Sequence, residues 1–388
     1  MSRGPLNRAL SGFTSTIFAE MSALATHTGS VNLGQGFPDF DGPASMLERA
    51  RRAIAEGVNQ YPPGAGDPDL RAAIAAHQRR FYGIELDPDS QVLVTAGATE
   101  GIAAAMLGLL EPGDEVVLLE PYYDSYAATI ALAGGVRRPV RLEPPDFALP
   151  RAAFAAAIGP RTRLLLINSP HNPTGAVLNG DDLAFIADLA VRHDLLVVTD
   201  EVYEHLTYDG VRHRPLSTLP GMADRTVTLS SAGKTFSATG WKIGWATGSA
   251  ELVSAVRAAK QFLTYVNGAP FQPAIAEALR LPDAYFNDFR TALQDKRDRL
   301  IDGLAAAGIA TFRPSGTYFV VADARSLGFD EGYELCRALP ALCGVVAVPM
   351  QVFYDDPDGA RQLVRFAYCK RDEVLDEAVR RLRSLRQD

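Results

Sequence analysis

The sequence predicts an α/β protein: a large three-layer α/β/α domain with a mostly parallel central sheet, and a smaller α/β domain. The first observation behind this prediction is a set of short apolar runs, rich in leucine and β-branched residues, that end in polar or small residues. Continuous apolar runs of this length are typical of strands that are buried on both faces of a parallel sheet. The runs span 92–95, 116–119, 164–167 and 195–198.

The second observation is that helical patterns separate these runs. Within 181–193 the apolar residues recur at helical spacing, and Asn179 and Asp182 are placed to cap the start of the helix. Alternation of strands and helices places helices on both faces of a sheet. In such sheets, ligands bind where the carboxyl ends of the strands meet loops.

The third observation is that the last hundred residues have a different pattern. Arginine-rich helical stretches at 292–307 and 372–386 flank strand-like runs at 318–322 and 345–348, which predicts a second, smaller α/β unit. The segment before about residue 42 is expected to pack on this unit or on a neighbouring subunit. The predicted domains are an N-terminal arm at 1–42 that belongs to the small domain, a large domain at 43–282 and a C-terminal small domain at 283–388.

The composition is typical of a soluble globular enzyme. Of the 388 residues, 47% are hydrophobic and 22% are charged, and the net charge of −8 argues against nucleic acid as a partner. No apolar segment reaches the roughly 20 residues that a membrane-spanning helix needs. The polar N-terminus differs from a secretion signal, so we predict a cytoplasmic protein. The three cysteines lack metal-ligand spacing and are interpreted as small buried residues, and no metal site is predicted.

The segment 230–245 carries the strongest chemical signal, because it sets Lys234 and Lys242 among serines and glycines in a chain that otherwise prefers arginine. A lysine amine that can lose its proton is what a Schiff base needs. Small residues and hydroxyls such as Ser231 let backbone N–H groups approach a phosphate. An aldehyde that carries a phosphate is pyridoxal 5'-phosphate (PLP). Composition alone leaves open which lysine has which role.

Polar residues follow three of the predicted strands, namely Asn168, Asp200 and Ser230, which predicts one shared site. A carboxylate such as Asp200 beneath a pyridine nitrogen keeps that nitrogen protonated, although a residue at this place is also a common helix cap. Tyr203 follows three residues later and can present its phenol beside the same ring. Asn172 lies in a turn rich in proline, where its amide is able to donate to a cofactor oxygen.

Three further features fit the same chemistry. Gly97, Ala98 and Thr99 join a strand to an alanine-rich helix, and a helix start with small residues is a ready anion site. Tyr123 is a candidate for stacking on a ring, with Tyr122 as its competitor. Arg365 has the planar guanidinium that binds a carboxylate through two hydrogen bonds, while surface exposure is the default for an arginine.

Several of these segments resemble motifs of the class I, fold type I PLP-dependent aminotransferases. The likeness rests on 230–245, on the Asp-Glu-x-Tyr pattern at 200–203 and on the Asn-Pro-x-Gly pattern at 172–175, and it extends over nearly the whole chain. The branch with kynurenine, glutamine and methionine aminotransferases is the most similar. Within it, the segments 16–25 and 258–265 look most like actinobacterial N-succinyldiaminopimelate aminotransferases.

The resemblance implies that Lys234 is the PLP lysine, that Lys242 binds the phosphate and that Arg365 binds the substrate carboxylate. It also implies that the segment 31–40 is a substrate loop and that Tyr61 reaches the phosphate of a neighbouring subunit, so that the active unit is a homodimer. The implied catalytic residues are Lys234, Asp200 and Tyr203. Cofactor contacts are expected from Tyr61, Gly97, Ala98, Thr99, Tyr123, Asn172, Asp200, Tyr203, Ser231, Lys234 and Lys242, and substrate contacts from Phe18, Gly36, Asn172, Tyr265 and Arg365.

The implied reaction is transfer of the amino group of an L-amino acid to a 2-oxo acid by a ping-pong mechanism. The pair N-succinyldiaminopimelate and 2-oxoglutarate is the leading expectation for the substrates. The alternatives are a broad-specificity aminotransferase of the methionine, glutamine or kynurenine type and a cysteine-S-conjugate β-lyase. A third alternative, a PLP-sensing regulator, is disfavoured because only about forty residues precede the large domain.

Overall fold

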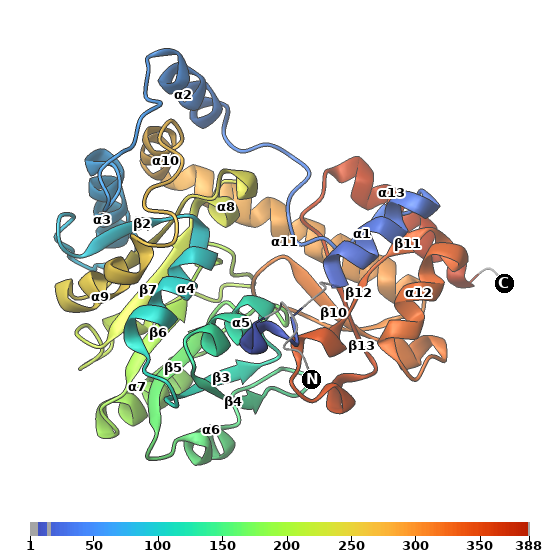
Figure 1. Cartoon of the computed structure of the whole chain (residues 1–388). Helices are drawn as coiled ribbons and strands as arrows, with labels where there is room; N and C mark the ends of the chain where they lie inside the picture. The colour runs from blue at the N-terminus through green and yellow to red at the C-terminus, as the bar shows by residue number, and fades with distance from the viewer. Residues whose placement is uncertain (1–6, 14–16, 387–388) are drawn as a thin grey trace.

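The computed structural model describes residues 7–13 and 17–386, and Figure 1 shows two units side by side. The first residues, on which the expectation about a secretion signal depends, lie largely outside the described part. The larger unit contains a seven-stranded sheet in the order β2-β8-β7-β6-β5-β3-β4. Its strands are β2 (Val92–Thr95), β3 (Glu115–Glu120), β4 (Val136–Arg141), β5 (Thr162–Asn168), β6 (Leu196–Asp200), β7 (Thr226–Ser231) and β8 (Gly244–Thr247).

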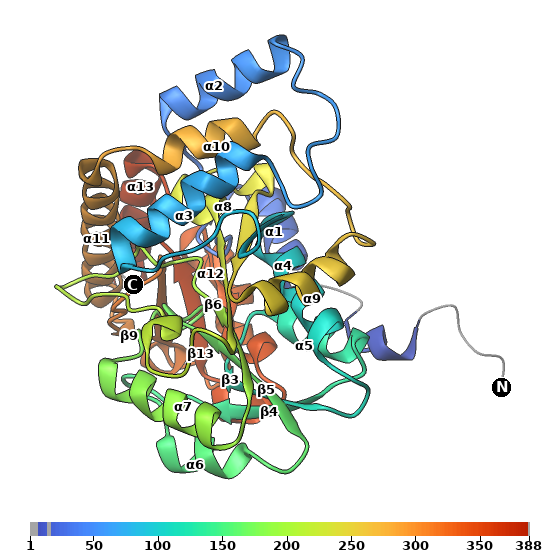
Figure 2. The ribbon, with the colours of Figure 1, turned by 90° about the vertical axis from the view of Figure 1, so that its left-hand side faces the viewer.

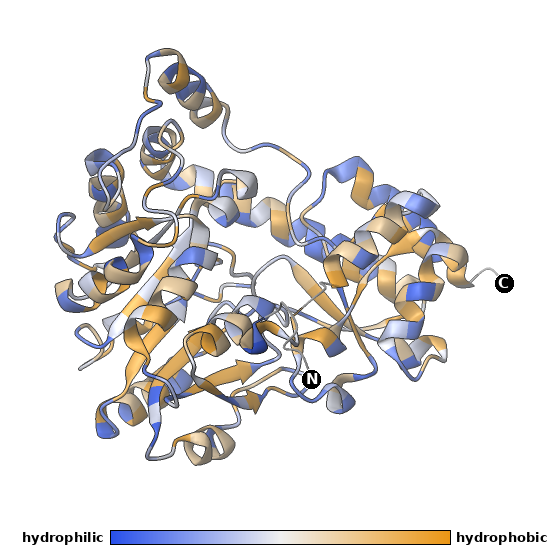
Figure 3. Cartoon of the chain, in the orientation of Figure 1, coloured by the Kyte–Doolittle hydropathy of each residue, from blue (hydrophilic) through white to orange (hydrophobic). Residues whose placement is uncertain are grey.

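The predicted mostly parallel sheet is confirmed. The strands from β4 to β7 pair in parallel, whereas β8 runs antiparallel to both of its neighbours. The four apolar runs became β2, β3, β5 and β6. Figure 3 shows the orange, hydrophobic strands in the middle of this unit.

Helices cover both faces of the sheet, which explains why the strands are apolar on both sides. Along β5, Leu164 and Leu166 pack in a cluster with one set of helices, and Leu165 and Ile167 pack in a cluster with the other set. The first set is α4 (Gly97–Leu109), α5 (Asp124–Leu132) and α9 (Ala250–Lys260), and the second includes α6 (Arg151–Ala157) and α7 (Gly180–Arg192). In Figure 2, a further layer at the top is formed by α2 (Ala44–Ala55), α3 (Pro68–Tyr82) and α10 (Gln272–Leu279).

The helix predicted at 181–193 is α7, and it is shifted by one residue. Asn179 caps it as predicted, since its side-chain oxygen accepts from the N–H groups of Asp181 and Asp182 at 3.0 Å each. The predicted capping role of Asp182 is wrong. Its carboxylate accepts from the Asn179 amide at 2.7 Å and from Arg151 at 2.9 Å, because it lies inside the first turn rather than before it.

The second unit has a four-stranded antiparallel sheet in the order β12-β13-β10-β9. The strands are β9 (Ala310–Phe312), β10 (Phe319–Asp323), β12 (Val348–Pro349) and β13 (Leu363–Ala367), and the helices are α11 (Asp283–Ala306), α12 (Gly332–Cys343) and α13 (Asp372–Arg383). The run predicted as one strand at 345–348 is divided between two sheets. β11 (Val345–Val346) pairs in parallel with β1 (Val31–Asn32), and only the residues that follow join the four-stranded sheet as β12.

Part of the N-terminal arm packs on this second unit, while its start, the short 3-10 helix η1 (Arg8–Leu10), contacts α5 of the larger unit. Besides the β1–β11 pairing, α1 (Ile17–Thr28) contacts α12 and β11. The residue boundaries predicted for the domains, 42/43 and 282/283, stay predictions. None of the described helices has the length and apolar character that crossing a membrane requires. The three cysteines are buried and unpaired, as predicted.

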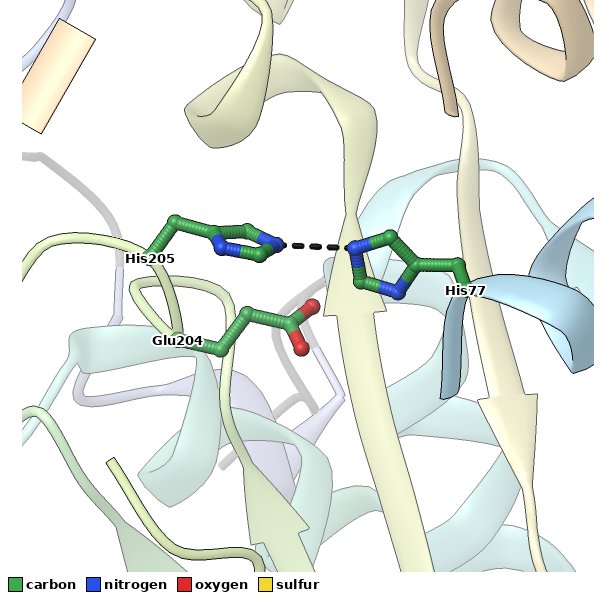
Figure 4. A group of neighbouring side chains, drawn as sticks. All are labelled: His77, Glu204 and His205. Carbon is green, nitrogen blue, oxygen red and sulfur yellow. Dashed lines mark hydrogen bonds between the residues drawn. The ribbon is translucent and has the colours of Figure 1, made fainter. Parts of the chain in front are cut away.

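His77 of α3 and His205 of the loop that follows β6 form a pair, in which the first ring is buried and the second half-buried (Figure 4). The Nε2 atoms of His77 and His205 lie 2.8 Å apart. Glu204 lies beside them, and the three side chains together offer donor atoms of the kind that bind metals. A hydrogen bond between neutral rings explains the pair, because two nitrogens held by one tetrahedral zinc ion would be about 3.3 Å apart. Burial lowers the pKa of His77 to about 3 and that of His205 well below its usual value.

This pair predicts a specific loss of stability in acid. Between pH 6.5 and about 3 the unfolded chain protonates both rings and the native protein does not, so the free energy of unfolding falls as the pH falls. Each histidine contributes about 1.4 kcal/mol per pH unit to this slope. In His77→Gln, the slope should therefore be smaller by about that amount between pH 6.5 and 5. Urea unfolding at several pH values measures it.

The exposed His27→Gln is the matched control, and its slope should equal that of the wild type. If His77→Gln and His27→Gln give parallel pH profiles, the buried pair does not govern acid sensitivity.

Candidate active site

A cavity of about 180 Å³ lies at the carboxyl ends of the central strands. The register of the sheet aligns Asn168 of β5 with Asp200 of β6, and the end of β7 lies beside them. The structure therefore gathers ten of the predicted residues from separate parts of the chain around one space. They are Gly97, Ala98, Thr99, Tyr123, Asn172, Asp200, Tyr203, Ser231, Lys234 and Lys242.

Lys234 enters the cavity from α8 (Ala232–Thr235), a single turn that follows β7 directly. Its Nζ donates to the hydroxyl of Tyr318 at 2.9 Å and lies 3.5 Å from the carbonyl oxygen of Gly36. Burial lowers the pKa of Lys234 to about 8, although the negative charge of Asp200 raises it in part. An amine with this pKa gains and loses a proton near neutral pH, as a general base requires.

Asp200 ends β6 with its carboxylate buried in the cavity wall. One oxygen accepts from the hydroxyl of Tyr126 at 2.6 Å, and the other accepts from the N–H of Val202 at 3.3 Å. The chain continues in turns here, so the carboxylate does not cap a helix. Burial raises the pKa of Asp200, and a cation placed in the cavity would stabilise its ionised form.

The start of α4 forms a cradle for an anion with Lys242. Lys242 Nζ donates to Thr99 Oγ1 at 3.3 Å. Gly97 has a φ of +71°, and a Cβ at this residue would lie 3.2 Å from Lys242 Nζ. The absence of a side chain at Gly97 thus lets the ammonium approach the first N–H groups of the helix. A helix start, a hydroxyl and a cation together suit a phosphate dianion.

Arg365 lies on β13 of the second unit and is almost fully buried, at 2% exposure. Its guanidinium donates to the side-chain oxygen of Asn172 at 3.1 Å and to the carbonyl of Gly34 at 3.3 Å. Its Nε is buried and has no hydrogen-bond partner among the residues that the structure describes. Burial lowers the pKa of Arg365 to about 10. A carboxylate that bound Nε and one terminal nitrogen would satisfy the free donor and stabilise the charge.

The remaining predicted residues lie around this site at different distances. Phe18 packs its ring 5.3 Å from the guanidinium of Arg365, and Gly36 contributes its carbonyl near Lys234. Tyr61 and Tyr265 contact each other edge to face at 5.7 Å on the surface, where Tyr61 is 82% exposed, and neither lines the cavity of its own chain. Tyr122, the competitor of Tyr123, donates its hydroxyl to Asp355 instead.

Two tyrosines that sequence reasoning missed support the predicted residues. Tyr126 bonds to Asp200, and Tyr318 bonds to Lys234. Tyr126 follows Tyr123 at one helical turn, so the helical period could have placed it near the same strand end. Tyr318 opens an apolar run that indicates only a buried strand, and its partner is 84 residues away.

Comparisons with known proteins agree with this geometry. The chain matches the family model of aminotransferase class I and II over residues 28–382. It is 57% identical over 380 residues to the probable N-succinyldiaminopimelate aminotransferase DapC of Mycobacterium tuberculosis, covering 95% of this chain and 96% of the relative. It is 40% identical over 370 residues to methionine aminotransferase of Escherichia coli, covering 95% and 96%. It is 36% identical over 400 residues to kynurenine–oxoglutarate transaminase 3 of Mus musculus, covering 96% and 88%.

The solved structure of N-succinyldiaminopimelate aminotransferase from Mycobacterium tuberculosis has a TM-score of 0.96 to this one at 57% identity, and the match covers 98% of this chain and 100% of that one. The chain therefore belongs to the aminotransferase class I and II family, as its motifs predicted. It is a PLP-dependent transaminase with the fold of that family. The site fits PLP, because it combines an anion cradle, an amine with a lowered pKa and a buried carboxylate.

The cradle predicts that Gly97→Ala weakens PLP binding. The added Cβ would push the ammonium of Lys242 away by a few tenths of an ångström, and the weakened charge-assisted hydrogen bond should lower affinity by up to about tenfold. Absorbance titration of the apoprotein with PLP measures the affinity.

Gly83→Ala is the matched control, because Gly83 has a similar φ of +69° but a Cβ there would meet nothing within 4 Å. Both variants should lose about 1–2 kcal/mol of stability from the left-handed backbone. Equal PLP affinities in the two variants would show that the cradle at Gly97 is unimportant.

Proposed function

We propose that this aminotransferase transfers the amino group of N-succinyldiaminopimelate to 2-oxoglutarate, which becomes glutamate, and that it works reversibly in amino acid biosynthesis. The observation that carries this proposal is the 57% identity to the Mycobacterium tuberculosis relative across 95% of the chain. Identity at this level is well above the 40% shared with the methionine enzyme. The expected location is the cytoplasm, and three buried, unpaired cysteines suit a reducing compartment.

In the proposed mechanism, Arg365 binds the α-carboxylate of the amino acid through its free Nε and one terminal nitrogen. Bound PLP supplies the electron sink that stabilises negative charge at the α-carbon. Lys234 is the residue that carries PLP and that later moves a proton as a free amine, which its lowered pKa allows. The apolar rings around Arg365 exclude water from the carboxylate, since Phe319 and Phe353 lie 4.0 and 5.0 Å from the guanidinium.

The remaining cofactor contacts are proposed as follows. Asp200 would face the ring nitrogen, with Tyr126 holding its carboxylate in place. Tyr123 would cover one face of the ring, and Tyr203 and Asn172 would donate to its phenolic oxygen. The Asn172 side-chain oxygen accepts from Arg365, so its Nδ2, which has no partner among the described residues, is oriented for this role. The phosphate contacts would come from Gly97, Ala98, Thr99, Ser231 and Lys242, with Phe18 and Gly36 beside the substrate.

A broad-specificity aminotransferase of the methionine type is the second candidate. The rings of Phe18, Phe319 and Phe353 around Arg365 favour it, because they present an apolar surface that suits a thioether or aromatic side chain.

Both candidates can be tested by adding single L-amino donors to the PLP-loaded protein without an oxo-acid acceptor. The donor that converts the PLP absorbance band to that of the aminated cofactor fastest identifies the substrate. We expect N-succinyldiaminopimelate and glutamate to react at least about tenfold faster than methionine, glutamine or phenylalanine. A faster response to methionine would replace the leading proposal with the second.

Arg365→Lys is the companion variant in this experiment. It should keep the PLP band but need about tenfold to a hundredfold more of every donor, because lysine cannot make the bidentate contact.

We propose that the active unit is a homodimer in which each chain completes the site of the other. Four apolar side chains form an exposed patch, with Tyr61 82%, Phe262 84%, Leu263 45% and Tyr265 50% exposed. A patch of this kind is typical of an interface between subunits. Both tyrosines of the patch were predicted as site residues, yet neither lines the cavity of its own chain.

Phe262→Glu should therefore convert the dimer to monomer, because it places a charge in an apolar interface. Sedimentation measures the mass of the particle. Leu342→Glu is the control, since it places the same charge on an exposed leucine, at 50%, on α12 of the second unit, away from the patch. A dimer that survives in Phe262→Glu would show that this patch is not the interface.

A further inference from the structure

A buried tyrosine links the lysine of the site to the N-terminal arm. The hydroxyl oxygen of Tyr318 lies 2.9 Å from Lys234 Nζ and 2.8 Å from the carbonyl oxygen of Gly36. The carbonyl can only accept and a lysine ammonium can only donate, which fixes the direction of both bonds. The phenol must donate to Gly36 and accept from Lys234.

The surroundings hold this phenol in one position. Tyr318 is 0% exposed and immediately precedes β10, which is paired on both sides. Its ring meets Tyr203 edge to face at 5.2 Å and Phe319 at 4.9 Å. Burial raises the pKa of Tyr318 well above its usual value, so the phenol keeps its proton and acts as an acceptor rather than as a base.

Lys234 has a long, flexible side chain, and its free amine needs a partner to stay over the cavity. The carbonyl of Gly36 is at 3.5 Å, the limit of a hydrogen bond, and the ring centre of Tyr203 is 5.7 Å away. Tyr318 therefore provides the short bond. Because Tyr318 comes from the second unit and Lys234 from the first, this bond also crosses between the two units.

We propose that Tyr318 is a positioning residue that holds the amine of Lys234 over the cavity whenever this amine is not covalently engaged. This inference rests on the proposed role of Lys234. Tyr318 gains and loses no proton in this role, because its own proton stays in the bond to Gly36 and the transferred proton stays on Lys234. Since the charged ammonium makes the stronger bond, the phenol also favours the protonated form of Lys234.

The same hydroxyl connects Lys234 to the arm that contacts Arg365. Gly36 accepts from Tyr318, and Gly34, two residues earlier, accepts from Arg365 at 3.3 Å. Hydrogen bonds to one short backbone segment, 34–36, therefore hold both the carboxylate-binding arginine and, through Tyr318, the lysine amine. Loss of the phenol should disturb the lysine and leave substrate affinity largely intact, because Arg365 keeps its own bonds.

The test compares Tyr318→Phe with Tyr368→Phe. Tyr368 is also 0% exposed, and its hydroxyl donates to the carbonyl of Thr317 at 3.1 Å, so the control removes a buried phenol bond next to Tyr318 without touching Lys234. The PLP-loaded wild type is first reduced with borohydride and digested. PLP found on a residue other than Lys234 would refute the proposed role of Lys234, before Tyr318 is tested.

Once PLP has been located on Lys234, the cofactor is removed from all variants. The reactivity of the Lys234 amine in these apoproteins is then measured by acylation at several pH values and peptide mass spectrometry. In Tyr318→Phe the midpoint should move down by about one pH unit, the tenfold effect expected when a bond to a charged group is lost. In Tyr368→Phe the midpoint should stay at the wild-type value.

Steady-state kinetics provide the second readout. In Tyr318→Phe, kcat should fall by about tenfold to a hundredfold while KM stays within about twofold. A midpoint that does not move in Tyr318→Phe, or equal losses of kcat in the two variants, would reduce Tyr318 to a packing residue and overturn the inference.

Discussion

The parallel register of β5, β6 and β7 is the constraint on which the site depends. Parallel strands end at the same edge of a sheet, so residues that are far apart in the sequence become neighbours there. The pairing of Asn168 with Asp200, and of Asp200 with Leu229 just before the β7 end, places an amide, a carboxylate and the lysine turn in one row. A shift of one residue in any of these strands would turn its polar end into the core.

The second unit completes the site by supplying groups that the sheet lacks. It contributes the guanidinium of Arg365 from β13 and the phenol of Tyr318 from the turn just before β10. Both groups are buried, and Arg365 meets Asn172 of the large unit through a side-chain oxygen rather than through a carboxylate. No ion pair joins Arg365 to a carboxylate among the described residues, and a buried cation without one is costly, so the binding of a carboxylate here would stabilise the charge.

Much of this arrangement was predictable because the signals are local. The strands are apolar on both faces, the lysine segment is rich in small residues, and Asn179 stands directly before its helix. What the sequence could not reveal depends on distant partners. The pairing of Val345 with Val31 splits one apolar run between two sheets, and β8 takes its antiparallel place between β2 and β7. Tyr318 looked like an ordinary core residue for the same reason.

The substrate range follows from what surrounds Arg365 rather than from the shared chemistry. Every donor presents the same α-carboxylate, so the contact with Arg365 cannot distinguish one amino acid from another. The rings of Phe18 and Phe353 pack against this arginine, and the exposed Tyr265 lies outside the cavity of its own chain. Discrimination between a long acylated donor and a thioether therefore depends on surfaces beyond the residues at the strand ends. For this reason, Asn168, Asp200 and the lysine turn at the strand ends indicate the reaction class, whereas similarity over the whole chain is the better guide to the substrate.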